Sequence, residues 1–104
     1  MRKMVLVAIL MLANSSLAIA DSNDIALKLG TVIAAEKFCG FDYDQKAIEN
    51  YIEKNVPASD MNFPSTLQLM VDGTAYNHQN MSKSAKTAHC FGIKRTAKHY
   101  KFIK

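Results

Sequence analysis

The chain has 104 residues, a formal net charge of +4 and two cysteines. This length predicts a single domain, and the absence of internal repeats, low-complexity tracts and linkers excludes a repeat or multidomain architecture. The charge is uneven, because residues 21–82 contain nine acidic residues and four lysines, whereas residues 83–104 contain seven basic residues and no acidic one. Such asymmetry predicts either a binding surface or a basic helix that lies against an acidic body of the same molecule.

The first twenty residues have the three-part pattern of a cleavable secretory signal peptide. Two basic residues precede an uninterrupted apolar run over 4–13, and an A-x-A cleavage site ends at Ala20. The run is shorter than the roughly 20 apolar residues of a membrane span, so we expect no stable membrane anchor after cleavage. We therefore expect a periplasmic protein, or alternatively a secreted one, whose single domain comprises residues 21–104.

Cys39 and Cys90 are predicted to form a disulfide, because an even number of cysteines in an exported chain favours oxidation. A bridge that closes a loop of about 50 residues contributes roughly 4 kcal/mol in the chain-entropy model. This is a large share of the stability expected for so small a domain. The alternative is a pair of free, buried thiols.

Helical spacing of apolar residues predicts a small all-α domain, and no segment shows the sustained alternation of a strand. Four helices are expected, over 25–38, 43–55, 61–77 and 83–100. The bridge would tie the end of the first helix to the middle of the fourth. The predicted N-caps are Asp24, Asp42, Asp60 and Ser82.

The ends of these helices carry their own signals. Gly40 is a natural stop for the first helix, and Pro57 ends the second. Pro64 would cost an early hydrogen bond if Asp60 caps the third helix, so Asn62 or Phe63 is an alternative start.

No constellation of catalytic or metal-ligating residues is recognisable. A zinc site needs three or four converging ligands. His89 and His99 lie ten residues apart on one predicted helix, so they cannot bind the same ion, and His78 could approach either of them. His89 and Cys90 point about 100° apart on a helix, which disfavours a cysteine nucleophile. We therefore expect no catalytic residue, no metal and no cofactor, and we interpret the histidines as exposed or half-buried polar residues.

The basic C-terminal helix is the one segment whose composition predicts a binding surface. Lys94, Arg95, Lys98 and Lys101 lie off the apolar stripe, and together they predict an exposed surface for an acidic protein partner. The alternative is a solvated face that balances the acidic remainder of the chain. Lysines on an amphipathic helix also suit anionic lipid or nucleic acid, but the apolar face is small and exported proteins rarely meet nucleic acid.

Four stretches, Ala34–Gly40, Tyr43–Asp44, Ile48–Val56 and Ser84–Cys90, resemble small exported helical proteins of alphaproteobacteria that have two cysteines. The resemblance implies a helical periplasmic domain and transfers no activity. In layout alone, the chain is similar to the periplasmic acid-stress chaperones of enteric bacteria, which are also short, helical and closed by one disulfide.

Three functions are consistent with these observations. The first is a non-enzymatic periplasmic binding or accessory protein, as the absence of a convergent site indicates. An acid-stress chaperone is the alternative, since three histidines and nine carboxylates would take up protons as the pH falls. The second alternative is a small enzyme.

Overall fold

The computed structural model describes residues 22–104, and all regular secondary structure in that range is helical. The first helix covers residues 22–39, and it is followed by α2 (Gln45–Asn55), α3 (Phe63–His78) and α4 (Lys83–His99). The predicted all-α class is confirmed. The predicted signal peptide lies outside the described residues. Within residues 22–104, none of the helices is long and apolar enough to cross a membrane.

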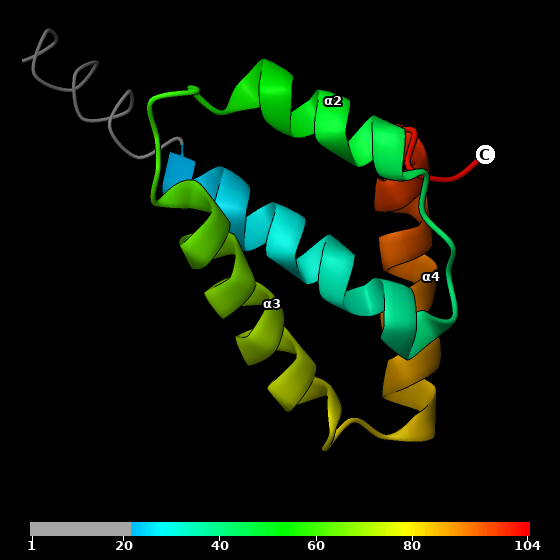
Figure 1. Cartoon of the computed structure of the whole chain (residues 1–104). Coiled ribbons are helices and arrows are strands. Elements are labelled where there is room, and N and C mark those ends of the chain that lie inside the picture. Colours follow the sequence, from blue (N-terminus) through cyan, green and yellow to red (C-terminus); the bar gives the residue numbers. More distant parts are fainter. Residues whose placement is uncertain (1–21) are drawn as a thin grey trace, which may run out of the picture.

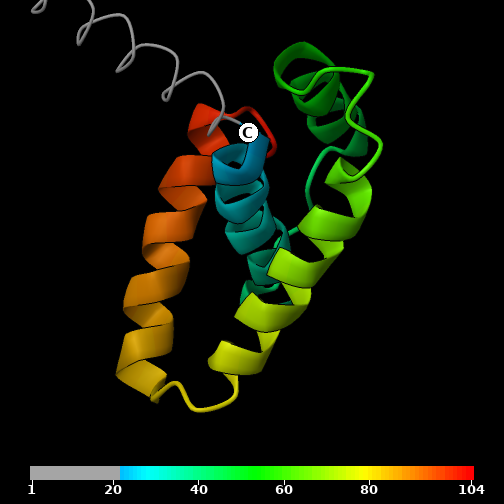
Figure 2. The same ribbon diagram turned by 90° about the vertical axis from the view of Figure 1, so that its left-hand side faces the viewer.

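The first helix is the central element of the fold. In Figure 1 it lies between α2 on one side and α3 on the other, with α4 crossing close to its C-terminal end. The view in Figure 2 shows α3 and α4 flanking it and approaching each other at the turn over 79–82. This position explains its burial pattern, since Ala26, Leu29, Val32, Ala34 and Ala35 are all buried.

Small residues on the first helix allow its neighbours to come close. A Cβ atom added at Gly30 would lie 2.7 Å from the Cβ of Met70 and 3.3 Å from the backbone of α3. The glycine therefore fixes how closely α3 approaches, because a backbone cannot give way as a flexible side chain can. Ile25 and Ile33 of the first helix are only partly buried and pack against the buried core from its edge.

Aromatic side chains fill the core between α2, the first helix and the end of α4. Phe102 is fully buried, and its ring centroid lies 5.5–5.9 Å from those of Tyr43, Tyr51 and Tyr100. The hydroxyl of Tyr43 donates a hydrogen bond of 2.9 Å to the Val32 carbonyl, so its polar atom is satisfied inside the core. Burial, with a smaller effect from Glu36, raises the pKa of Tyr43 to about 12. We call Tyr43, Tyr51, Tyr100 and Phe102 the aromatic core.

Three of the four predicted N-caps are wrong. Asp24 lies inside the first helix and pairs with Lys28 at 3.0 Å. Asp44, and not Asp42, caps α2 by accepting from the backbone N–H groups of Lys46 and Ala47. The third helix begins at Phe63 after Asn62, one of the alternatives, with the proline in the first turn where it costs no hydrogen bond.

The physical reason is that tertiary contacts decide which helix end is used. Tyr43 was expected to begin the second helix, but its burial beside Val32 holds it just before α2, whose cap Asp44 is extended. Only Ser82 caps as predicted, accepting from the backbone N–H of Ala85 at 3.1 Å. The predicted stop at Gly40 is confirmed, since its φ of +73° is the left-handed conformation that ends helices.

Candidate functional site

The basic residues of α4 are exposed, but they do not form one continuous row. Lys94, Arg95 and Lys98 lie on the helix, whereas Lys101 follows its end and adopts a φ of +66°. Lys98 and Lys101 line a shallow hollow of about 720 Å³ that also includes Asp42 and Asp44. Lys101 is exposed as well, but it lies beyond the helix, where the chain turns back to bury Phe102.

An exposed aromatic residue completes the outward face of α4. The ring of Phe91 is 62% exposed, and the guanidinium carbon of Arg95 lies 5.2 Å from its centroid. The two residues are four apart, so they are neighbours on the helix surface. Sequence reasoning missed Phe91, although its position off the stripe of Cys90 and Ile93 could have revealed it. We call Phe91, Lys94, Arg95 and Lys98 the basic face.

The basic face has no ion-pair partner among the described residues. Over residues 22–104, the ion pairs within 4.0 Å join Lys28 to Asp24 and Lys46 to Glu49, and neither involves α4. The acidic residues of the hollow, Asp42 and Asp44, approach only one end of the basic face. The cations are therefore available to a partner, although solvent and salt screen them.

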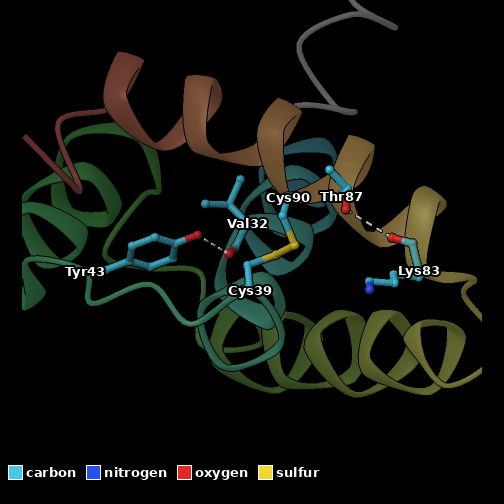
Figure 3. The surroundings of a disulfide bond; sticks show 6 residues. All are labelled: Val32, Cys39, Tyr43, Lys83, Thr87 and Cys90. Atoms are coloured by element: carbon cyan, nitrogen blue, oxygen red, sulfur yellow. Dashed lines mark hydrogen bonds between the residues drawn. A yellow bond between two sulfur atoms is a disulfide. The ribbon is translucent and has the colours of Figure 1, made fainter.

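The predicted disulfide is confirmed. Cys39, at the end of the first helix, is bonded to Cys90 in the middle of α4, with their Cα atoms 5.6 Å apart. Figure 3 shows the bridge between these helices, with the Tyr43–Val32 hydrogen bond to one side and the Thr87–Lys83 hydrogen bond of α4 to the other. Since Cys90 is bonded, His89 has no thiol beside it to activate.

Beside the bridge, three rings from three helices pack together. His78 is the last residue of α3, and its ring stacks on Phe38 of the first helix with 4.1 Å between centroids. The ring of His89, from α4, lies 5.1 Å from that of His78. We call Phe38, His78 and His89 the histidine cluster. The interpretation of the histidines as exposed or half-buried is wrong for His78, which is 6% exposed.

The histidine cluster is polar but poorly satisfied. The Nε2 atoms of both His78 and His89 are buried and have no hydrogen-bond partner. Burial lowers the pKa of His78, and the neighbouring His89 lowers it further. The sequence left open whether His78 approaches His89 or His99, and no signal chose between them, because His78 and His89 are eleven residues apart on different helices and meet only through the turn between them. The third histidine, His99, is exposed at the end of α4.

Two imidazoles alone are an incomplete ligand set for zinc, which takes three or four protein ligands. In the part of the chain that the structure describes, no three His, Cys, Asp or Glu side chains gather as the ligands of one ion would. The expectation that the protein holds no metal remains a prediction.

No protein-family model, curated protein or solved structure matches this chain. The resemblance to small exported proteins with two cysteines therefore remains a prediction, and function has to be argued from the surface and the clusters described above.

Proposed function

We propose that the protein is a non-enzymatic periplasmic binding or accessory protein that docks an acidic protein partner through the basic face of α4. The observation that carries this proposal is the exposed Phe91 ring beneath the Arg95 guanidinium, with Lys94 and Lys98 on the same helix and no ion pair from these cations to any residue of 22–104. The disulfide is compatible with an oxidising, exported environment, which supports the location.

The composition of this face suits protein recognition. Aromatic residues and arginine supply most of the binding energy at protein interfaces, and a cation held over an aromatic ring is already oriented for a carboxylate. The surrounding lysines would attract an acidic surface and raise the rate of encounter. Residues 83–104 contain no acidic side chain that could compete for the partner's contacts.

The test is replacement with Gln of the two lysines of the basic face, Lys94 and Lys98, together with Lys101 next to Lys98 in the hollow, in one variant, and of Phe91 with Ala in another. The partner is recovered from periplasmic extract by cross-linking, and its association with each variant is then measured at low and high salt. We expect the triple variant to associate more slowly with an unchanged melting temperature, because rim charges act mainly on encounter. Phe91→Ala should speed dissociation.

A matched control removes the same charge elsewhere. Lys46, Lys54 and Lys83 are exposed and lie outside the basic face, so changing all three to Gln should leave association almost unchanged. If the lysines of the basic face instead balance the acidic body, their removal should lower stability by only a few tenths of a kcal/mol per pair while partner recovery stays normal. That result would exclude the basic face as a docking site.

We propose an acid-stress chaperone as the second candidate, and a different surface supports it. On α3, Leu69 and Tyr76 are 69% and 68% exposed and lie two turns apart on one face, and Met61 just before the helix is 82% exposed. Apolar side chains on a mainly polar surface can hold non-native segments. The measurement is client aggregation at acidic and at neutral pH; equal protection at both, or none, would eliminate this candidate.

A further inference from the structure

We propose that the histidine cluster is a proton-operated latch, which holds the C-terminal end of α3 against the first helix and α4 at neutral pH and releases it in acid. This inference goes beyond the proposed docking function, because it concerns different residues and would stand if the basic face bound nothing.

The latch depends on how α3 is attached. Its only buried residues are Phe63 at the first position and His78 at the last. The contact of Met70 with Gly30 holds the middle of the helix, whereas Gly73, Ala75, Tyr76 and Asn77 are exposed. His78 is therefore the main anchor of the last turns of α3 and of the turn that follows.

Protonation weakens this anchor because the charge would have no acceptor. The Nε2 atom of His78 is buried and unpartnered, and so is that of His89, 5.1 Å away between ring centroids. An imidazolium at His78 would be desolvated, would bury an N–H without a hydrogen bond and would face the ring of His89 instead of an acceptor. Opening the contact lets water solvate the charge.

The charged groups that face the cluster add to this effect, since they are cations. Lys37 of the first helix lines a hollow of about 410 Å³ together with His78 and Phe38. The ammonium of Lys86, from α4, lies 4.6 Å from the centroid of Phe38.

The nearby carboxylates serve other contacts. Glu36 accepts from the backbone N–H of Tyr43, Asp72 of α3 accepts from Gln68, and α4 contains no acid. No described carboxylate lies within 4.0 Å of an imidazole nitrogen of the cluster, so none pairs with the new charge.

The direction of the pH dependence follows from the lowered pKa of His78. A base whose pKa is lower in the closed state than in the open state stabilises the closed state fully above its ordinary value of about 6.5. That stabilisation is lost as the pH falls through the lowered pKa. At a pH below both pKa values, the ratio of open to closed molecules is raised tenfold for each unit by which the pKa of the closed state lies below that of the open state.

The release is local, because covalent and packing contacts hold the rest. The disulfide joins the residues next to Phe38 and His89, so the first helix and α4 stay together. Phe63 and Met70 keep the first half of α3 in place. What opens is the end of α3 and the turn over 79–82, which uncovers the apolar side chains of Ala34 and Phe38 on the first helix.

The experiment is amide hydrogen exchange of the oxidised protein, as recovered from cells, from about pH 7.5 to about pH 4.5, a window that brackets the ordinary imidazole pKa. After correction for intrinsic rates, protection of residues 75–79 should be lost in acid, while that of α2 stays constant. His78→Phe keeps a ring that stacks on Phe38 and does not titrate, so protection of residues 75–79 should fall less in acid in this variant than in the wild type. His99→Gln removes an exposed histidine of α4 and should behave as the wild type.

Two results would overturn the latch. One is equal protection of residues 75–79 in the wild type across the whole range, a comparison that requires no variant. The other is a loss of protection in His78→Phe as steep as in the wild type, which would assign the acid response to carboxylates elsewhere. Neither result bears on docking by the basic face, whose test is association at constant pH.

Discussion

The aromatic core around Phe102 and the histidine cluster around His78 each join the first helix to other elements, but with different chemistry. In the aromatic core, the Tyr43 hydroxyl has a hydrogen-bond acceptor and Phe102 is completely enclosed. In the histidine cluster, two ring nitrogens are buried without partners, and Lys37 and Lys86 lie beside the rings. The comparison teaches that burial alone does not make a contact stable, because an unsatisfied polar atom offsets the gain from packing.

The segments that flank the two regions also differ in how firmly they are attached to the rest of the molecule. The segment after α4 returns to the aromatic core, where the backbone N–H of Asp44 donates to the Phe102 carbonyl at 2.7 Å. At the other end, residues 83–88 of α4 are all exposed and the last turns of α3 are attached mainly through His78. We therefore expect the aromatic core to set global stability and the histidine cluster to set local opening.

The largest expected effect is that of Phe102→Ala, which should destabilise the protein by about 3–5 kcal/mol, as for other fully buried phenylalanines. Phe38→Ala, its counterpart in the histidine cluster, should cost less than half as much, because that ring is only partly buried. Denaturant unfolding of both variants measures the difference. Equal losses would show that the two regions form one cooperative unit, and the comparison would then fail.

Breaking the disulfide should have the next largest effect. Cys39→Ser should cost about 4 kcal/mol, within the usual range of roughly 2–5 for small secreted domains. The bridge closes 51 residues and lies beside the histidine cluster, so its loss should expose that end first. Thermal unfolding with and without reductant, together with thiol titration, provides the check. Two titratable thiols in the native protein would contradict the bridge. An unchanged midpoint of thermal unfolding after reduction would show that the bridge does not contribute to stability.

Gly30→Ala should have a smaller effect, a loss of about 1–3 kcal/mol as in other overpacked cores. The new methyl group would press on Met70 and on the backbone of α3, midway between Phe63 and His78. Gly73→Ala on the same α3 helix is the matched control. No atom lies within 4 Å of its added Cβ, so it should raise stability by roughly 0.5–1 kcal/mol through helix propensity. If both variants behaved alike in chemical unfolding, the close approach at Gly30 would have no energetic role.

Hydrophobic spacing and cysteine usage were sufficient to predict four helices, their order, the bridge and the exposure of Lys94, Arg95 and Lys98. These features depend on residues that are close together in the sequence, or on the single pairing that two cysteines allow. The sequence alone is therefore sufficient to predict them. The helix starts were less predictable, because Asp42 and Asp44 are equally good caps by residue type. Burial of Tyr43 against the first helix decided between them.

The sequence by itself therefore determined the helical class, the bridge and the basic character of the last helix, since these depend on periodicity, cysteine number and composition. Only the tertiary structure decided that His78 meets His89, that Phe91 stands exposed beneath Arg95 and that Lys101 leaves the helical row. Each of these depends on which face of a helix is covered by segments distant in the chain. The periodicity of one helix gives the direction of its faces, whereas their neighbours are set by packing of the whole domain.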